Sequence, residues 1–386
     1  SRGVFSIDSL KGFLGLSKRE KLGRAVAGLL IAAVLLAGLA GFVARALAQR
    51  RVSESERMVT TGVAFIMDTF VEYEFFGENG PQAKDAVDAA LRDIENRMSM
   101  YIDDSEIAAL NRNAGRAFVP LSEDTYELLE RCAAYGAESD GVFDVTVAPV
   151  AQVWGLTRGR VFIPDSEQIA SRLALVDYRD ILLDPETHSA MLRREGQAVD
   201  LGGIAKGFAC GAADRIAREN GVESGFISIG GNIMTIGQKP VADQAGRTVR
   251  QPFRFGLRDP RGGENDYIAA VVLEDTTMAT SGDYERYFMK DDVRYHHILD
   301  PATGYPARTD LMSVSVVSQD GAFADFMSTW LFIKGRSFVL ERLNSFDCGL
   351  IVIDQDKNVY ISENMRERVV PADKSGAYTF VSGGTA

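Results

Sequence analysis

The residues best suited to acid–base chemistry stand between residues 280 and 306, which read TSGDYERYFMKDDVRYHHILDPATGYP. Two of the three histidines of the chain, His296 and His297, are adjacent there, and Asp300 and Gly304 follow them. The pattern predicts a strand that delivers histidines and a carboxylate to a tight loop, a common place for catalytic groups. Neighbouring residues of a strand face opposite sides, so only one of the two histidines can point into a given site.

A second candidate is the stretch DLGGIAKG at residues 200–207, where an acid precedes two glycines and a lysine. We expect the lysine in the first turn of a helix, whose exposed amides and positive dipole end would suit a phosphate or pyrophosphate. The spacing is neither that of a Walker motif nor that of a dinucleotide-fold glycine motif. On this stretch alone, an anion site and a plain strand–turn–helix corner both stay open.

A third candidate is the pair Asp325 and Thr329 in an expected helix over residues 322–334. A step of four residues puts the carboxylate and the hydroxyl on one face of the helix, and Mg²⁺ prefers such oxygen ligands. The competing interpretation is that Asp325 caps the helix or forms a surface ion pair. Apolar neighbours predict a largely buried helix, and a buried acid needs a partner, which favours the metal.

The other histidine and the cysteines carry weaker signals. His188 lies in the turn PETHSA and is expected to face solvent. The cysteines, which stand far apart and without paired spacing, are Cys132, Cys210 and Cys348. This arrangement indicates buried thiols rather than a disulfide framework or a zinc site.

The elements that must position these groups predict an α/β fold of the mixed α+β kind. Residues 62–77 alternate in character, which indicates one or two strands around a turn. Three stretches show helical spacing after a proline or serine start signal: residues 81–100, 105–115 and 122–139. Further strands are expected before Asp200 and on both sides of the glycines at 230–231. The tail after residue 363 is expected to be polar and turn-rich.

Charge limits the partners of the protein. The chain of 386 residues has a net charge of -12, and its first 57 residues hold ten Lys and Arg against four Asp and Glu. The remainder therefore carries 32 basic against 50 acidic residues, a net charge of -18. This acidic balance argues against nucleic acid as a partner.

Residues 25–44 form an apolar run of twenty residues without a charge, about the length that crosses a bilayer as a helix. Basic residues dominate before it, so the positive-inside tendency places residues 1–24 in the cytoplasm. Residues 45–58 would then be a tether, and residues 59–386 a catalytic domain on the periplasmic side of a bacterial inner membrane. A cleaved signal peptide is the alternative, because residues 46–48 read ALA.

Taken together, these pieces resemble the ApbE-type FAD:protein FMN transferase family. The matching stretches, in the order of the family, are MDTF at 67, SMYIDDSEIAALN at 99, SDGVFDVTVAPVAQVWG at 139, DLGGIAKGFA at 200, SIGGNI at 228, TSGDYERYF at 280, YHHILDPATGYP at 295 and ADFMST at 324. The resemblance implies that FMN moves from FAD to a Ser or Thr hydroxyl of a target protein, with Mg²⁺ required and AMP released. It also implies a mixed α/β fold with a flavin cleft between two lobes.

The resemblance further implies roles for single residues. The implied contacts to FAD are Met67, Tyr101, Val142, Phe143, Asp144, Asp200, Lys206 and Ile298. The implied metal ligands are Asp325 and Thr329, with a backbone carbonyl of the turn from Gly203 to Ala205. His297 aligns with the histidine of the family and would take the hydroxyl proton, whereas His296 is given a structural role. Mg²⁺ on the pyrophosphate would neutralise charge on the leaving AMP.

Two features depart from this pattern or add to it. The family usually has glycine after the methionine of its first motif, whereas this chain has Asp68. A carboxylate there is expected to crowd or repel the dinucleotide if the backbone passes close to it. The stretch SGGT at residues 382–385 faintly resembles a flavin-acceptor motif, but no aspartate stands at the usual position before it, which argues against self-flavinylation.

The expected partner is a protein with a Ser or Thr acceptor motif, such as a subunit of a membrane electron-transfer complex of Rnf or Nqr type. Two other functions stay open. A metal-dependent FAD pyrophosphatase would use water in place of the hydroxyl at the same site. A non-catalytic FAD-binding subunit of a membrane complex would bind the dinucleotide unchanged, and Asp68 is the best support for it.

Overall fold

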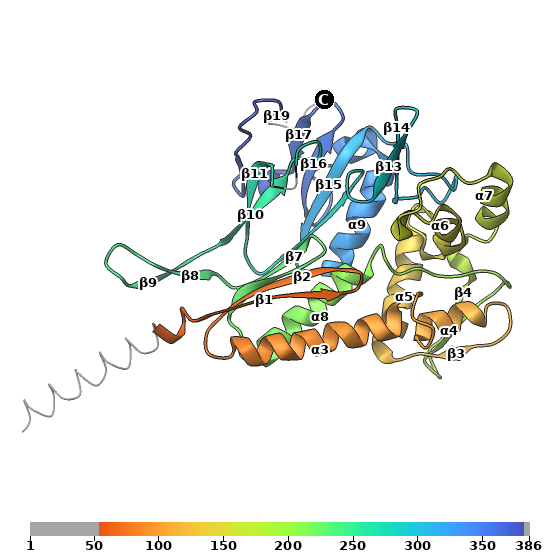
Figure 1. Ribbon diagram of the computed structural model, residues 1–386, viewed down its shortest axis with the longest axis horizontal. Coiled ribbons are helices and arrows are strands. Elements are labelled where there is room, and N and C mark those ends of the chain that lie inside the picture. Colours follow the sequence, from red (N-terminus) through yellow and green to blue (C-terminus); the bar gives the residue numbers. More distant parts are fainter. Residues whose placement is uncertain (1–53, 264, 382–386) are drawn as a thin grey trace, which may run out of the picture. The chain divides into compact units, whose positions relative to one another are not determined.

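A central sheet organises the chain in a computed structural model that describes residues 54–263 and 265–381 (Figure 1). Within these residues the sheet has nine strands, and every neighbouring pair is antiparallel except the last. In spatial order the strands are β1 (Val59–Ile66), β2 (Thr69–Phe76), β6 (Ser224–Ile229), β7 (Asn232–Ile236), β12 (Thr277–Gly282), β15 (Leu311–Ser318), β16 (Gly349–Asp354), β17 (Asn358–Ile361) and β19 (Thr379–Val381).

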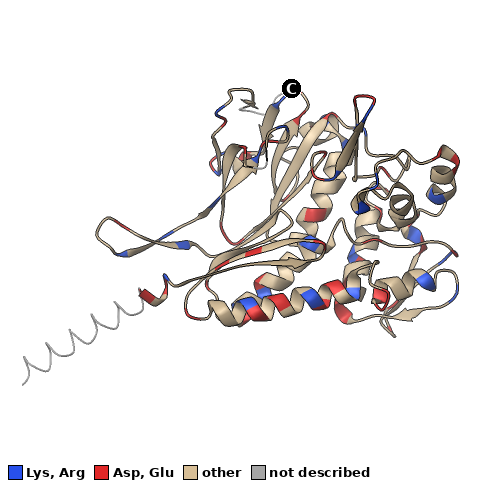
Figure 2. Cartoon of the chain, in the orientation of Figure 1, with Lys and Arg blue, Asp and Glu red and all other residues tan. Residues whose placement is uncertain are grey.

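Three helices pack against this sheet: α3 (Gly80–Met98), α8 (Ala205–Glu219) and α9 (Gly321–Lys334). In α3 the buried residues recur every three or four positions, and Lys and Arg alternate with Asp and Glu on its other face (Figure 2). Helix α9 is apolar and buried almost all round, as a helix inside a core must be. Helices α8 and α9 contact each other, and they also contact β7 and β12 respectively. Asp325, which lies where the two helices meet, is buried.

The remaining elements surround this layer. The helices are α4 (Glu106–Arg112), α5 (Glu123–Glu138), α6 (Ala148–Trp154), α7 (Ser166–Leu173) and α10 (Arg336–Glu341), with short 3-10 turns η1 (Val145–Val147), η2 (Leu156–Arg158), η3 (Tyr178–Asp180) and η4 (Glu363–Met365). Two small sheets are β3 (Val119–Pro120), β5 (Ser189–Leu192) and β4 (Ile181–Asp184), and β10 (Phe253–Arg258), β11 (Tyr267–Leu273) and β18 (Val369–Pro371). Two hairpins are β8 (Lys239–Ala242) with β9 (Thr248–Gln251), and β13 (Tyr287–Lys290) with β14 (Val293–His296).

Three apolar clusters hold these parts together. The largest fills the space between the sheet and α3, α8 and α9, and a second lies between the sheet and β10, β11 and β18. The third surrounds Trp154, whose Nε1 donates a 2.8 Å hydrogen bond to the carbonyl oxygen of Gly304. That bond fixes the loop after β14 against α6. From Met58 onward the chain forms one compact unit, and its division into two lobes stays an expectation of the resemblance.

Most elements expected from the sequence are present. The mixed α/β class, the helices at 81–100, 105–115, 122–139 and 322–334, and the strands on both sides of residues 230–231 are confirmed. The three cysteines are free and buried, and His188 is exposed, as predicted. The tail after residue 363 holds more structure than expected, because β18 pairs with β11 and β19 with β17.

The strand predicted before Asp200 is wrong. Residues 197–200 belong to no helix or strand. The side chain of Asn111 takes the place of a partner strand: its Nδ2 donates to the carbonyl of Val199, and its Oδ1 accepts from the amide of Val199. The buried backbone is thereby satisfied, and the apolar pattern that suggested a strand reflects burial alone.

Several expectations fall outside the described residues. These are the cytoplasmic segment at 1–24, the apolar run at 25–44, the tether as far as residue 53, and the stretch SGGT at 382–385. Within the part of the chain that is described, no helix combines the length and the hydropathy that a membrane span requires.

Candidate active site

The two adjacent histidines lie in different surroundings. His296, at the end of β14, is buried; its Nε2 lies 2.9 Å from the carbonyl oxygen of Ala307, and its ring meets Phe332 of α9 edge to face. His297 follows the strand, and its amide donates a 3.0 Å hydrogen bond to the carbonyl oxygen of Arg286. This separation agrees with the alternation expected from a strand.

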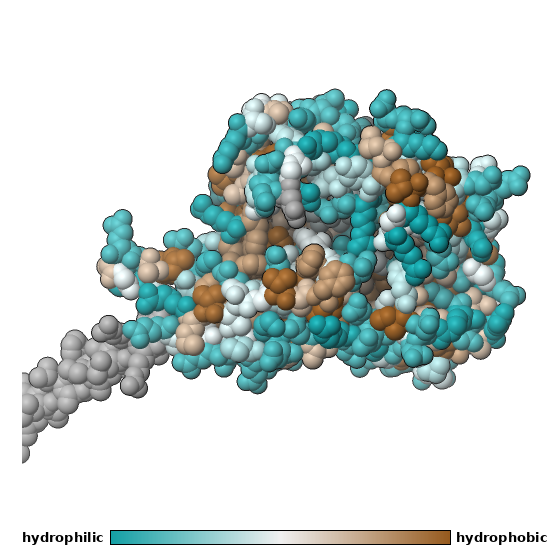
Figure 3. Space-filling model, in the orientation of Figure 1, coloured by the Kyte–Doolittle hydropathy of each residue, from teal (hydrophilic) through white to brown (hydrophobic). Residues whose placement is uncertain are grey.

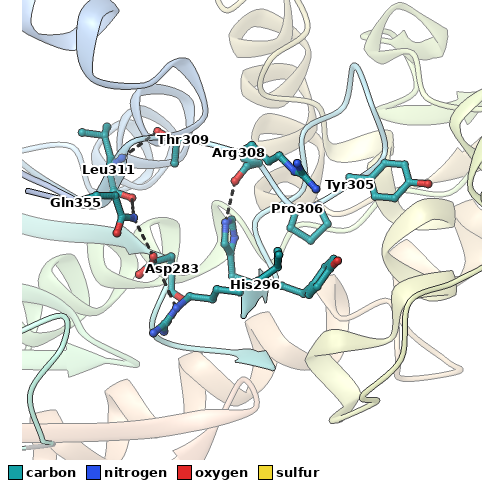
Figure 4. A pocket seen from close by; sticks show the side chains of 12 residues that line it. Asp283, His296, Tyr305, Pro306, Arg308, Thr309, Leu311 and Gln355 are labelled. Atoms are coloured by element: carbon teal, nitrogen blue, oxygen red, sulfur yellow. Dashed lines mark hydrogen bonds and ion pairs between the residues drawn. The ribbon is translucent and has the colours of Figure 1, made fainter. Parts of the chain in front are cut away.

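On the side of His296 lies a pocket of about 250 Å³ (Figure 4). Its wall includes Asp283, whose carboxylate makes two hydrogen bonds of 2.7 and 2.6 Å with Arg261 and accepts a third from Gln355. None of the flavin or metal contacts implied by the resemblance lines this pocket, and His297 does not line it either. We therefore place the candidate active site on the side of His297.

The environment of His297 keeps its imidazole neutral. Burial lowers the pKa of His297 to about 3, and the nearby positive charges of Lys206 and Arg286 and the neighbouring His296 act in the same direction. Its Nδ1 is buried and finds no hydrogen-bond partner among the described residues. A neutral imidazole with a free nitrogen is the state that a proton acceptor needs.

The glycine-rich turn before α8 forms a second wall. Oδ1 of Asp200 accepts a 2.9 Å hydrogen bond from the amide of Gly202, and α8 begins at Ala205. Burial raises the pKa of Asp200, and the positive charge of Arg286 opposes this rise. A Cβ at position 203 would lie 3.6 Å from the ring of Phe143, an ordinary contact distance, so the turn passes directly beside this ring.

Asp325 of α9 is only 5% exposed and lies where α9 meets α8. Its Oδ2 accepts a 2.9 Å hydrogen bond from the amide of Gly207. Burial raises the pKa of Asp325, and the positive charge of Lys206 opposes this rise. Asn232 adds a weaker attraction, although its buried Nδ2 makes no hydrogen bond of normal geometry among the described residues. The carboxylate is therefore buried with spare capacity for a cation.

Thr329 lies one turn after Asp325, and its Oγ1 is 3.1 Å from Oγ of Ser281 on β12. Ser281 also contacts the hydroxyl of Ser328 at 2.9 Å. A buried carboxylate, a hydroxyl and backbone carbonyls such as those of the turn at 203–205 are the types of oxygen donor that a hard divalent cation such as Mg²⁺ takes. Residues 54–263 and 265–381 contain no group of three or more His, Cys, Asp or Glu side chains placed for a metal. The donor set expected for Mg²⁺ contains only one side chain of these four types, Asp325, because its other members are a threonine hydroxyl and backbone carbonyls.

Several implied flavin contacts are themselves packed into the fold. Phe143 is buried edge to face against Phe326 of α9, and Val142 packs on the main cluster. Asp144 begins η1, because its carboxylate accepts hydrogen bonds from the amides of Thr146 and Tyr178, each 2.8 Å long. The carboxylate of Asp144 thus binds backbone amides. These hydrogen bonds lower its pKa, but burial has the larger effect and raises the pKa overall.

The other implied contacts differ in their exposure to solvent. Met67 lies in the turn between β1 and β2, where its amide donates a 2.9 Å hydrogen bond to Glu95. Tyr101 is 44% exposed, with the guanidinium of Arg158 4.4 Å from its ring centroid. Ile298 is buried directly after His297.

Two cations connect these groups. Lys206 acts electrostatically on both His297 and Asp325, and Arg286 acts on both His297 and Asp200. No described carboxylate forms an ion pair with Lys206. Sequence reasoning missed Ser281, Arg286 and Asn232, yet each stands in a stretch that carried the resemblance: TSGDYERYF or SIGGNI.

Comparison with known proteins gives a consistent picture. The model of the ApbE family matches residues 67–352. A curated FAD:protein FMN transferase of Treponema pallidum is 33% identical over 293 residues, which cover 74% of this chain and 81% of that protein. One from Klebsiella pneumoniae is 30% identical over 287 residues, covering 73% of this chain and 85% of the other.

Solved structures agree. The crystal structure of the ApbE protein of Thermotoga maritima superposes with a TM-score of 0.72 at 32% identity, over 81% of this chain and 99% of that one. The flavin transferase ApbE of Vibrio cholerae gives a TM-score of 0.70 at 23% identity, again over 81% of this chain and 99% of that one. The second match supports the fold.

Proposed function

Since this chain belongs to the ApbE family and is an FAD:protein FMN transferase, we propose which of its residues perform the transfer and how. Transfer joins the hydroxyl oxygen of an acceptor protein to the phosphorus of the FMN half of FAD. The bond from that phosphorus to the oxygen that leaves with AMP breaks, and the hydroxyl proton passes to a base. The chain must therefore supply a base, a cradle for two phosphates and compensation for the charge on the leaving group.

His297 is the base. Its imidazole is neutral in the free enzyme, and one buried nitrogen has no described partner. Lys206 and Arg286 contribute to its low pKa of about 3, so an anion that pairs with these cations would raise that pKa toward the useful range. Binding of the pyrophosphate thus strengthens the base at the moment it is needed.

The turn from Asp200 to Lys206 cradles the pyrophosphate. Gly202 and Gly203 are exposed at the start of α8, where amides and the positive end of the helix dipole favour an anion. Lys206 adds a full positive charge in the first turn of the helix. These features support the expected contacts of Asp200 and Lys206 to FAD.

Asp325, Thr329 and the carbonyls of Gly203 and Ala205 would hold Mg²⁺. When bound, the ion would neutralise negative charge on the phosphates as AMP leaves. Asp325 suits this role because its buried carboxylate has one hydrogen bond and a raised pKa. The observation that carries the whole proposal is the 2.9 Å hydrogen bond from the amide of Gly207 to Oδ2 of Asp325, which brings the carboxylate to the start of α8, next to Lys206 in the chain. The positive charge of Lys206 also acts on His297.

The test is a transfer assay with the purified protein, FAD, Mg²⁺ and a protein that bears a flavin-acceptor threonine. Intact mass of the acceptor should rise by one FMN, and the rise should vanish with a chelator or with Asp325→Ala. AMP and free FMN without an adduct would indicate a pyrophosphatase. FAD that stays bound and unchanged beside a proven acceptor would indicate a binding subunit.

We also propose where the enzyme works. The apolar run at 25–44 would anchor it in the bacterial inner membrane with the catalytic unit on the periplasmic side, next to acceptors in membrane redox complexes of Rnf or Nqr type. Membrane fractionation followed by N-terminal sequencing tests this. A membrane-bound chain that keeps residues 25–44 would support the anchor, whereas a soluble periplasmic chain that starts after residue 48 would indicate a cleaved signal peptide.

A further inference from the structure

The turn between β1 and β2 has an unfavourable sequence for its conformation. Ile66 pairs with Thr69, so Met67 and Asp68 alone form the turn, with φ angles of 59° and 54°. Two-residue turns with positive φ at both positions favour Asn and Gly, and a side chain in this region costs about 1–2 kcal/mol per residue. Asp68 stands where the family usually has glycine, so its carboxylate needs an explanation.

Asp68 is bound by Arg286, a residue distant in the sequence. Its Nη2 donates a 3.0 Å hydrogen bond to the carbonyl oxygen of Asp68 and lies 3.1 Å from Oδ2 of the same residue. The two residues are 218 positions apart. The side chain of Asp68 is 72% exposed and that of Arg286 is 41% exposed, so water and ligands reach the pair.

Arg286 also belongs to the active site. Its carbonyl oxygen accepts the 3.0 Å hydrogen bond from the amide of His297. Its positive charge acts on His297 and on Asp200, which are the expected base and an expected contact to FAD. The guanidinium therefore contacts the β1–β2 turn, and its charge reaches two groups of the expected FAD site.

We propose that Arg286 is a phosphate-binding residue of the FAD site and that Asp68 is an internal competitor for it. A guanidinium offers paired donors that match a phosphate, and such charge-assisted hydrogen bonds are stronger than neutral ones. An exposed ion pair contributes little free energy, so a pyrophosphate with two negative charges displaces the carboxylate of Asp68. When FAD binds, its pyrophosphate replaces the carboxylate of Asp68 as the partner of Arg286.

This exchange revises the expected effect of Asp68. Its carboxylate is paired with Arg286 in the free enzyme, so it lowers the affinity for FAD by occupying a cation and not by facing the dinucleotide. The inference rests on FAD as the substrate, and it does not depend on His297 as the base or on Mg²⁺. Binding of FAD without acceptor and without metal is therefore the proper readout.

The experiment is a double-mutant cycle on the full chain with Asp68→Asn, Arg286→Gln and the double variant, in which the Kd of FAD is measured by quenching of flavin fluorescence. Asn keeps the size of Asp and tolerates positive φ, so the turn is preserved. Arg286→Gln should raise the Kd roughly tenfold or more, as expected for a lost charge-assisted phosphate contact. Asp68→Asn should lower the Kd by about twofold to fivefold, the range of an exposed ion pair.

The double variant decides between the interpretations. If Asp68 acts through Arg286, adding Asp68→Asn to Arg286→Gln leaves the Kd unchanged. An equal gain from Asp68→Asn in both backgrounds would mean direct repulsion of FAD by Asp68, and an unchanged Kd in Arg286→Gln would mean a purely structural pair. Either result overturns the proposal.

Controls separate binding from folding. Arg116→Gln removes another exposed ion pair, with Glu195 at 2.5 Å, and should leave the Kd of FAD unchanged. Thermal unfolding checks that each variant is folded. If Arg286→Gln is unfolded, Arg286→Lys serves in its place, because a point charge without the paired donors should still weaken FAD binding by several-fold. A Lys variant with unchanged Kd and unchanged response to Asp68→Asn would overturn a guanidinium-specific contact.

The turn also lies beside an exposed apolar face. Phe65 and Phe70, which flank it on β1 and β2, are 58% and 65% exposed and meet edge to face at 5.6 Å. Hydrophobic side chains gather over this hairpin in Figure 3. Substitutions at Asp68 are therefore preferred to substitutions on β1 or β2, which would change this apolar face as well.

Discussion

The amide nitrogen of Gly207 donates a 2.9 Å hydrogen bond to Oδ2 of Asp325, at the place where α8 and α9 meet. A Cβ at position 207 would overlap the carbonyl oxygen of Gly321, and a Cβ at position 321 would overlap the carbonyl oxygen of Gly207. Both glycines are therefore required for the close approach of the two helices. That approach carries the carboxylate to the start of α8, beside Lys206.

Gly207→Ala tests this crossing. The added methyl group must push α8 and α9 apart, so we expect a loss of about 3 kcal/mol in the free energy of unfolding, measured by urea denaturation. Transfer should fall as well, because Asp325 moves with α9. Gly211→Ala is the matched control in the same helix: nothing lies within 4 Å of its Cβ, so we expect a gain of about 0.5–1 kcal/mol. Equal effects of the two substitutions would contradict the packing argument.

His297→Ala should abolish transfer and spare FAD binding. Loss of a base typically lowers a rate by about 10² to 10⁴, and the imidazole is not needed to hold the dinucleotide. The measurement is the rate of FMN attachment to an acceptor together with the Kd of FAD. Unchanged transfer would remove His297 from the mechanism, and a large rise in the Kd would make it a binding residue.

His296→Ala is the contrasting substitution next to it. Its imidazole is buried, bonds to the carbonyl of Ala307 and packs on Phe332. We expect a loss of about 2–4 kcal/mol in the free energy of unfolding from the cavity and the unpaired carbonyl. The folded fraction should retain transfer at a temperature where the variant is stable. A folded but inactive variant would show that the two histidines act together.

The sequence predicted well what depends on local spacing. Only His296 lines the pocket beside β14, which agrees with the alternation expected at the end of a strand, and the position of Thr329 one turn after Asp325 follows from helical spacing. The helix that carries Asp325 is buried as its apolar neighbours indicated. These inferences needed no knowledge of which elements meet in space.

Contacts between distant segments could not be predicted in this way. Arg286 meets Asp68 over 218 residues, and Ser281 meets Thr329 over 48. No periodicity in the chain encodes such pairs, so Asp68 was expected to repel FAD directly. The strand expected before Asp200 failed for a related reason: the side chain of Asn111, 88 residues away, pairs with the backbone of Val199.

Asp325→Asn should separate stability from activity. Burial raises the pKa of Asp325, so its charged form is held at a cost in folding free energy, and the neutral amide should increase the stability at pH 7. Transfer should be lost. Mg²⁺ should raise the melting temperature of the wild type but not of this variant, since an ion that binds only the folded state stabilises it.

Two substitutions of Thr329, one that keeps the hydroxyl and one that removes it, test the other expected side-chain ligand by the same shift in melting temperature. Thr329→Ser keeps the hydroxyl and should keep the response of the melting temperature to Mg²⁺, whereas Thr329→Val should lose it. A variant of Asp325 that still responds to Mg²⁺ would show that the ion binds elsewhere. Equal responses of the Ser and Val variants would exclude the hydroxyl as a ligand.

The low pKa of His297 predicts how stability changes with pH. Burial and nearby positive charges lower this pKa from 6.5 to about 3, so the unfolded chain binds a proton at this residue more readily than the folded chain. Its contribution to stability is complete above pH 6.5 and is lost as the pH falls toward 3. In His297→Gln the free energy of unfolding should therefore fall less steeply between pH 6 and 4, by up to about 1.4 kcal/mol per pH unit. Urea unfolding of both proteins at several pH values measures the two slopes. His296 and the buried carboxylates are present in both proteins, so their effects cancel in the comparison. Equal slopes would mean that the pKa of His297 is the same in the folded and unfolded chain.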